Sequence, residues 1–293
     1  MAQQTNKPDI YQELTDRMIA ALERGTVPWH QGWSVELAPR NLTSGKRYRG
    51  INTFLLSIVQ ADNDYSGPYW LTFKQCKERG GHVKAGEKGT PVVFWKRLPI
   101  TTTDEETGEE GLALIPFARK YTVFNACQCE GVEVPVTERT VHLENEQIAA
   151  AEKIAAEMPN RPHIEHNNGS SSFYRPSTDT VTLPHLKYFD SAPDYYSTLF
   201  HELGHSTGHK NRLNRQINNR FGSEKYSREE LVAELTSVFL CSECGLTDIN
   251  FDNSAAYINS WLKELKNDKK LVVIAAAQAQ KAADYILNRK FAD

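Results

Sequence analysis

A five-residue segment, His201-Glu202-Leu203-Gly204-His205, constrains this chain of 293 residues more than any other part of it. The segment lies in a predicted helix that Ser191 can cap and that ends near Gly208. Histidines four residues apart lie one helical turn apart on one face, where both imidazoles can bind the same metal ion. The segment therefore predicts a metal-binding helix rather than an ordinary amphipathic one.

Glu202 is the candidate catalytic residue of this helix. It lies about 100° around the helix from His201, close enough to act on a water at the ion without being a ligand. Zinc lowers the pKa of such a water toward 7, so that Glu202 can accept a proton as general base and the hydroxide can attack a carbonyl. Tyr226 is a candidate for stabilising the oxyanion that forms. The expected cofactor is one divalent metal ion, with Zn²⁺ favoured and Mn²⁺ or Co²⁺ as alternatives.

A catalytic zinc needs a third protein ligand, and the metal-binding helix does not provide it. A histidine six residues after His205 would serve, but that position holds Asn211. A second predicted helix, residues 227–241, carries carboxylates near its start, and Glu230 is the first choice among them. The sequence therefore predicts a site shared by two helices.

The choice of carboxylate on this second helix stays open. Glu230 shares a stripe with small residues that would let the two helices approach closely, and Glu234 would orient a ligand histidine without binding the ion. Alternatively, Ser227 and Glu230 form a capping box at the helix start. In that case Glu229 is the ligand.

Positive charge is concentrated between residues 40 and 100, although the whole chain carries a net charge of −3. This span holds eleven Lys and Arg against four acidic residues, and aromatic residues lie within it and just before it. Bases of a single strand stack on aromatic rings while Lys and Arg contact the phosphates. The pattern predicts binding of a single-stranded nucleic acid, which the resemblance described below implies to be DNA. The candidate residues are Trp29, Trp33, Arg40, Lys46, Arg47, Tyr48, Arg49, Trp70, Lys74, Lys84, Lys88, Trp95, Lys96 and Arg97.

The composition, 40% hydrophobic and 24% charged, is typical of globular proteins. No stretch approaches the roughly 20 apolar residues of a membrane span, and the N-terminus lacks a signal-peptide pattern. Five cysteines form an odd, sparse set for a secreted disulfide scaffold. We therefore expect a protein of a reducing cytoplasm that does not bind membranes.

Periodicity and turn residues indicate an α+β fold in two domains. The N-terminal α+β domain, residues 1–135, binds the single strand; a linker spans 136–143; and the mainly helical domain with a small sheet spans 144–293. Helices are predicted at 9–25, 51–61, 72–79, 144–158, 191–208, 227–241, 254–266 and 269–289. Strands are predicted at 91–96, 113–117, 121–125 and 163–166, with a hairpin at 172–183.

Both halves of the chain resemble known families. The C-terminal half resembles the zincin-type metallopeptidase domain of plasmid and phage polyvalent proteins, through HELGHSTGHKNRLNR followed by FGSEKYSREELVAELTSVFL. The N-terminal half is similar to the ArdC antirestriction family and to the matching region of TraC-type conjugative primases. Its motifs are PWHQGW, NLTSGKRYRGIN, YWLTFKQCKERGGHVKAGEKGTPVVFWKR and VFNACQCEG.

The resemblance implies a single-stranded-DNA-binding domain joined to a zincin-like metallopeptidase domain. It also implies that the protein protects plasmid DNA from host restriction while that DNA enters the recipient as a single strand. Two hypotheses follow. In one, the protein is a DNA-associated zinc protease that uses Glu202 to cleave a protein, such as a host defence factor. In the other, it is a non-catalytic protein that coats the single strand, and its metal site is structural or vestigial.

Overall fold

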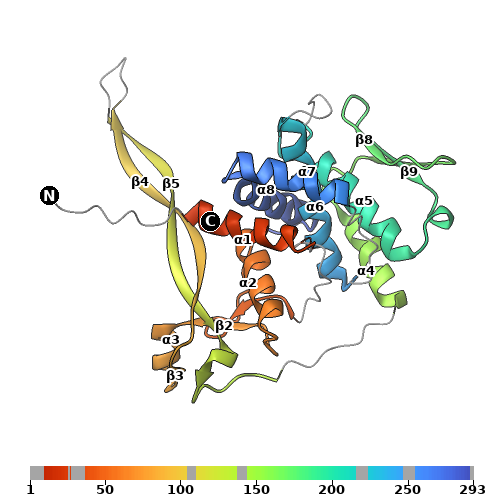
Figure 1. The fold of residues 1–293 in the computed structure, drawn as a ribbon. Helices are drawn as coiled ribbons and strands as arrows, with labels where there is room; N and C mark the ends of the chain where they lie inside the picture. The colour runs from red at the N-terminus through yellow and green to blue at the C-terminus, as the bar shows by residue number, and fades with distance from the viewer. Residues whose placement is uncertain are drawn as a thin grey trace. The chain divides into compact units, whose positions relative to one another are not determined.

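The computed structural model describes residues 10–25, 27, 37–103, 110–136, 144–215, 224–246 and 255–290, with backbone alone for 10, 95–103, 110–118, 224–226 and 255–257. These residues form two compact units, whose elements are drawn in Figure 1. The first, here called the helical unit, comprises the described parts of 1–38, 48–58 and 137–290. The second, the sheet unit, comprises 39–47 and 59–136.

The helical unit is built around three helices and a small sheet. Helix α6 (Glu224–Cys244) packs against both α5 (Ala192–Ser206) and α8 (Leu271–Ile286). The sheet has the order β7-β9-β8, with β9 parallel to β7 and antiparallel to β8, and α5 packs against β8 and β9. The other elements are α1 (Ile10–Glu23), α2 (Ile51–Asp62, with 59–62 in the sheet unit), α4 (Glu144–Glu157), α7 (Ala255–Asn267), β7 (His163–Asn167), β8 (Phe173–Arg175), β9 (Thr180–Pro184) and η3 (Leu186–Tyr188).

Helix α5 begins at its predicted cap. The Ser191 hydroxyl accepts a hydrogen bond from the backbone N–H of Asp194, and Pro193 occupies the first turn, where its missing N–H costs nothing. Phe200 and Leu203, which lie beside the histidines in the same helix, are fully buried. Their burial fixes the rotation of α5, and therefore the direction in which its histidines point.

Small side chains allow the central helices to pack closely. Helix α8 buries a row of alanines, and α6 buries Leu231 and Leu235 completely. From α2, the ring of Phe54 packs 5.0 Å from the ring of Phe239 on α6. The buried alanines of α8 are Ala275, Ala276, Ala279, Ala282 and Ala283.

The sheet unit contains a four-stranded sheet in the order β1-β2-β5-β4. Strand β2 (Tyr69–Thr72) pairs in parallel with β1 (Arg40–Asn41) and antiparallel with β5 (Glu110–Asn125), which pairs antiparallel with β4 (Thr90–Thr103). Helix α3 (Phe73–Glu78) follows β2 directly through a capping box of Thr72 and Gln75. In a second pair, β3 (His82–Val83) is antiparallel to β6 (Cys129–Glu130), which directly follows the 3-10 turn η2 (Ala126–Gln128).

The predicted α+β class in two domains is confirmed, and several details differ. The predicted strands 113–117 and 121–125 are one strand, because exposed Arg119 and Lys120 interrupt the apolar pattern without interrupting the pairing with β4. Helix α6 starts at Glu224 rather than Ser227. Helix α1, predicted in the N-terminal domain, packs against α7 and α8 of the helical unit. In the described part of the chain, no helix is both long and apolar enough to cross a membrane.

Candidate functional site

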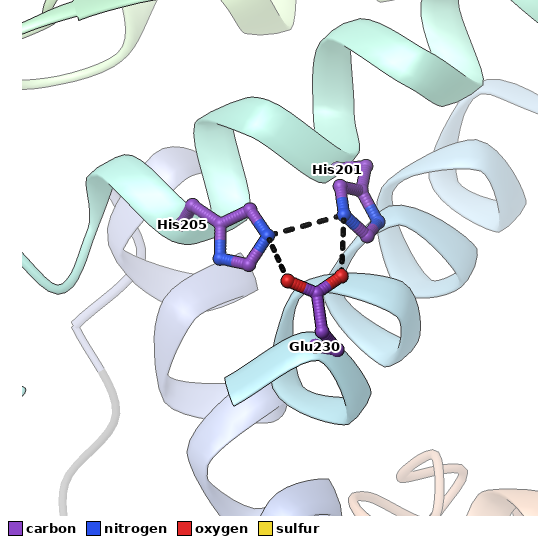
Figure 2. A group of neighbouring side chains, drawn as sticks. All are labelled: His201, His205 and Glu230. Atoms are coloured by element: carbon purple, nitrogen blue, oxygen red, sulfur yellow. Dashed lines mark hydrogen bonds and ion pairs between the residues drawn. The ribbon is translucent and has the colours of Figure 1, made fainter. Parts of the chain in front are cut away.

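The two histidines of α5 lie beside Glu230 of α6, as Figure 2 shows. The Nε2 atoms of His201 and His205 are 3.1 Å apart. One carboxylate oxygen of Glu230 lies 3.6 Å from Nε2 of His201, and the other lies 3.4 Å from Nε2 of His205. One donor atom from each residue lies within 4.8 Å of the other two, and no other group of His, Cys, Asp or Glu in the described ranges is arranged in this way.

Small residues bring the two helices close enough for this arrangement. A Cβ placed on Gly204 would lie 3.1 Å from the Cα of Ala233, so the two backbones are in near contact. One turn further along α6, the Ser237 hydroxyl donates a 2.7 Å hydrogen bond to the carbonyl of Ser197 on α5. The predicted stripe of small residues on α6 is therefore confirmed.

A second carboxylate lies behind each histidine. Glu234 Oε2 lies 3.4 Å from Nδ1 of His201, as expected for a residue that orients a ligand, and Glu229 Oε1 lies 3.5 Å from Nδ1 of His205. On the His205 ring, Glu229 therefore faces Nδ1, whereas Glu230 faces Nε2. The capping-box argument for Glu229 as the ligand was wrong, because α6 begins at Glu224 and Ser227 lies inside the helix.

The charges around the histidines favour a cation. Burial lowers the pKa of His201, but hydrogen bonds to Glu230 and Glu234 and the charge of Glu202 outweigh burial and raise that pKa well above its ordinary value of 6.5. For Glu229, burial raises the pKa, but hydrogen bonds with His205 and Arg215 outweigh it and hold the pKa below its ordinary value. The site thus holds more carboxylates than cationic side chains, which favours an added cation. The carboxylates are those of Glu202, Glu229, Glu230 and Glu234, beside His201, His205 and Arg215.

Arg215 is a site residue that the sequence analysis did not assign: it ends the motif HELGHSTGHKNRLNR, but nothing in the sequence shows which group its guanidinium contacts. Its guanidinium donates hydrogen bonds of 3.1 Å and 2.7 Å to the two oxygens of Glu229. It also donates to the carbonyl of Gly204 at 2.9 Å and to the hydroxyl of Thr207 at 2.7 Å. The Arg215 guanidinium therefore connects the end of α5 to the first turns of α6.

The two candidate catalytic residues differ in how far the structure describes them. Glu202 lies on α5 next to His201 and is 6% exposed, so its carboxylate is in a largely desolvated position. Tyr226 lies in the first turn of α6, one turn before Glu230, and its side chain is outside the described atoms. Its role at an oxyanion stays a prediction.

Three of the predicted DNA-binding residues belong to the packed interior or to an ion pair. Trp70 is 0% exposed, with the ring centre of Tyr65 6.1 Å from its own, and Tyr48 is 7% exposed. Neither ring has a face for a base, so these two predictions were wrong. The Arg49 guanidinium pairs with the carboxylate of Asp284 on α8, and we therefore assign it to the fold of the helical unit.

The other basic candidates with described side chains lie in the sheet unit. Arg40 is half-buried, with its guanidinium 6.0 Å from the centre of the Tyr69 ring. The exposed ones are Lys46, Arg47, Lys74, Lys84 and Lys88. Trp29 and Trp33 lie outside the described residues, and Trp95, Lys96 and Arg97 lie in β4 with only their backbone described.

The sheet unit also exposes aromatic rings of the basic span that are not among the candidate DNA-binding residues. Phe73 is 60% exposed and Phe94 is 43% exposed. The ring of Phe94 lies edge-on to Tyr121 at 5.5 Å, and the guanidinium of Arg119 lies 5.3 Å from the Tyr121 ring centre. Residues 101–140 hold three Lys and Arg against eight acidic residues, so their net charge does not indicate a basic surface. The adjacent residues Arg119, Lys120 and Tyr121 repeat the basic–aromatic pattern and could have identified the cluster.

Comparisons with known proteins identify the family. Residues 8–124 match the model for the N-terminal domain of anti-restriction factor ArdC, and residues 149–278 match that for a zincin-like metallopeptidase. The metal-free crystal structure of the antirestriction ArdC protein from the R388 plasmid is 39% identical, with a TM-score of 0.75. The alignment covers 97% of this chain and 100% of that one. The chain belongs to the ArdC antirestriction family.

Other relatives of this ArdC-family chain extend the comparison. The Mn(II)-bound structure of the R388 ArdC protein is 38% identical, with a TM-score of 0.75, over 96% of this chain and 97% of that one. The uncharacterized protein y4eC of Sinorhizobium fredii is 39% identical over 95% of this chain and 91% of its own length. A DNA primase TraC of Escherichia coli is 39% identical over 96% of this chain, which spans 27% of that primase.

Proposed function

We propose that this chain is an antirestriction protein with two separable activities: metal-dependent peptide hydrolysis in the helical unit and single-stranded DNA binding by the sheet unit. The observation that carries the first activity is the set of donor atoms from His201, His205 and Glu230 within 4.8 Å of one another, with Glu202 buried on the same helix. The zincin-like match over residues 149–278 supports the same chemistry.

The residues present fit a divalent cation. Two imidazole nitrogens and one carboxylate are the donors of catalytic zinc sites, and the surplus of carboxylates around them offsets the charge of the ion. When bound, the cation supplies Lewis acidity, which acidifies water and polarises a carbonyl. We propose Zn²⁺ as the ion, with Mn²⁺ or Co²⁺ as alternatives; the R388 relative has been solved with Mn(II).

The protein's own groups move the proton and hold the ligands. Glu202 would accept a proton from water and pass it to the leaving nitrogen, which is the role of a general base and acid. Glu234, at Nδ1 of His201, would hold that ring so that Nε2 faces Glu230. Tyr226 would donate a hydrogen bond to the developing oxyanion.

The peptidase proposal is tested with the full chain, labelled casein as a general substrate and one equivalent of Zn²⁺, with and without an unlabelled oligothymidylate. Glu202→Gln removes the base but leaves all three donors in place. We expect it to lower cleavage at least 100-fold, the usual contribution of acid–base catalysis, and to leave zinc binding unchanged. Cleavage by Glu202→Gln at the wild-type rate would refute the role of Glu202.

The DNA-binding proposal depends on the exposed basic and aromatic residues of the sheet unit. Lys and Arg would contact phosphates, and the exposed rings would stack on bases. Binding of fluorescein-labelled oligothymidylate should weaken steeply with salt, with a slope in log K of about −0.7 for each phosphate neutralised. A response that is flat in salt would exclude this mode of binding.

A conjugation assay separates the two activities in the cell. We infer that the protein acts in the cytoplasm of the recipient bacterium, where plasmid DNA arrives as a single strand. The transfer frequency into a restricting host is measured with wild type, Glu202→Gln and a variant with Lys46 and Arg47 reversed to Glu. If hydrolysis of a host factor protects the DNA, Glu202→Gln abolishes protection. If Glu202→Gln protects fully and the charge reversal does not, the protein acts by coating the strand.

A further inference from the structure

Arg215 contacts both helices that carry the proposed metal ligands. Through Nε and Nη2 it binds both carboxylate oxygens of Glu229 on α6, and through Nη2 it also binds the carbonyl of Gly204 on α5. Its side chain is 10% exposed and that of Glu229 is 9% exposed, so the pair is nearly desolvated. A two-point guanidinium–carboxylate contact of this kind fixes direction as well as position.

This contact distinguishes two glutamates that are adjacent in sequence. Glu229 has both oxygens held by Arg215, whereas both oxygens of Glu230 face the Nε2 atoms of the two histidines. A carboxylate held at both oxygens cannot turn toward an ion without breaking two charged hydrogen bonds. Glu230, which is 28% exposed, stands where an ion would be bound.

The same contact also determines how His205 is presented. Glu229 Oε1, while bonded to Arg215, lies 3.5 Å from Nδ1 of His205. A carboxylate held there keeps the proton on Nδ1, so the lone pair of Nε2 points toward His201 and Glu230. Arg215 therefore acts on a ligand histidine through Glu229 and does not touch the histidine itself.

We propose that Arg215 is a positioning residue of the metal centre: it holds Glu229 behind His205 and thereby leaves Glu230 as the carboxylate that binds the ion. This inference rests on the proposed metal-dependent function. It assigns different roles to Glu229 and Glu230, a choice that the sequence alone leaves open.

The chain offers a matched control in Arg212, which is a second buried arginine on the same segment. Arg212 is bonded to Asp179, the hydroxyl of Tyr174 and the carbonyls of Ser206 and Asn160. Its side-chain partners, Asp179 and Tyr174, bond to Arg212 and to each other rather than to a ligand histidine. Loss of Arg212 should therefore lower stability without acting on the ion.

The test is a titration of the metal-free full chain with Co²⁺, followed by its visible absorption, which gives an affinity and a signature of the ligand set. Arg215→Met and Glu229→Gln should each weaken Co²⁺ binding about tenfold, the usual loss when a residue that supports a metal ligand is removed. The double variant should be no weaker than Glu229→Gln alone, because Arg215 acts through Glu229. Arg212→Met should lower the melting temperature and leave the Co²⁺ affinity of the folded protein unchanged.

If the double variant instead bound Co²⁺ about a hundredfold more weakly than wild type, the proposal would be overturned. Such a loss is the product of the two single losses, which is expected when two residues act independently. Wild-type affinity in Arg215→Met would also overturn it. If Arg215→Met does not fold, Arg215→Lys and Glu229→Gln decide: both must weaken Co²⁺ binding, and wild-type affinity in either one refutes the role. Glu230→Gln is run alongside; if it binds Co²⁺ like wild type, the metal centre itself is wrong rather than the role of Arg215.

Discussion

Gly204 of α5 packs directly against Ala233 of α6, with no side chain between the two backbones. A Cβ on Gly204 would meet the Cα of Ala233 at 3.1 Å, its carbonyl oxygen at 3.3 Å and the Cβ of Thr236 at 3.2 Å. These neighbours are backbone atoms and a β-branched side chain, which cannot turn away. The distance between the two helices, and therefore the distance from the histidines to Glu230, depends on this glycine.

Gly204→Ala should accordingly destabilise the protein and weaken metal binding together. Overpacking costs about 1 to 3 kcal/mol, and the better helix propensity of Ala returns up to about 1 kcal/mol. We expect a net loss of about 1 to 2 kcal/mol in urea unfolding and a measurable loss of Co²⁺ affinity. The control is Gly169→Ala, where the new Cβ meets only the end of the Asn167 side chain at 3.5 Å. An unchanged metal affinity in Gly204→Ala would mean that the helices tolerate separation.

The ion pair of Asp179 with Arg212 predicts a pH dependence of stability. The hydrogen bonds from Arg212 hold the pKa of Asp179 below its ordinary value of 3.8. Because the folded pKa is the lower one, the pair stabilises the fold fully above that ordinary value. The contribution is lost as the pH falls through the lowered pKa.

Asp179→Asn tests this directly, and the backbone of Asp179, with φ of 49°, tolerates Asn well. The side chain of Arg212 is 1% exposed, so removal of its partner leaves a buried charge unpaired and should cost about 3 kcal/mol near neutral pH. Urea unfolding of both proteins between pH 7 and about 3 should show that the difference shrinks on acidification. A difference that stays constant over this range would assign the loss to packing instead.

Arg47 and Arg49 are near neighbours in sequence with different expected roles. Arg47 is exposed in the sheet unit, whereas Arg49 pairs with Asp284 in the helical unit. Arg47→Gln should weaken oligothymidylate binding and reduce the salt slope by about 0.7, the share of one phosphate contact. Arg49→Gln should instead lower the melting temperature and leave the salt slope unchanged. Equal effects of the two variants on DNA affinity would contradict the assignment of Arg49 to the fold.

The metal-binding helix could be predicted from sequence because its signals are local. The cap at Ser191, the spacing of His201 and His205 and the position of Gly204 all act within a few turns of one helix. The second helix was found through the need for a third ligand. The partner of Glu229 was not found, because Arg215 reaches it only through the tertiary fold and no periodicity marks such a contact.

The DNA-binding residues were harder to predict for a related reason. Charge and aromatic content identify a segment, but they do not tell which rings face solvent. Trp70 and Phe94 both lie on strands of one sheet, yet Trp70 is fully buried and Phe94 is 43% exposed. Val92 and Val93, on the same edge strand as Phe94, are buried, so exposure depends on what packs against each face of the sheet, and the sequence pattern does not specify that packing.

Phe94 is therefore the ring that we expect to stack on a base. It is 43% exposed and packs against Tyr121, and Arg119, its partner in register across β4 and β5, lies on the same face of the sheet. Phe94→Leu keeps an apolar side chain but removes the flat face, and stacking on one base contributes about 1 to 3 kcal/mol. We expect binding of labelled oligothymidylate at fixed salt to weaken about tenfold, with little change in melting temperature.

The matched control is Tyr188→Leu, which removes an exposed ring from the helical unit. Tyr188 is 53% exposed, more than Phe94, but it lies on η3 in the helical unit. The exposed basic candidates, by contrast, all belong to the sheet unit. Its replacement should leave the DNA affinity at the wild-type value. If Tyr188→Leu weakens binding as much as Phe94→Leu does, exposed rings contribute in general and no particular stacking site exists. If only Phe94→Leu weakens binding, the strand contacts this face of the four-stranded sheet.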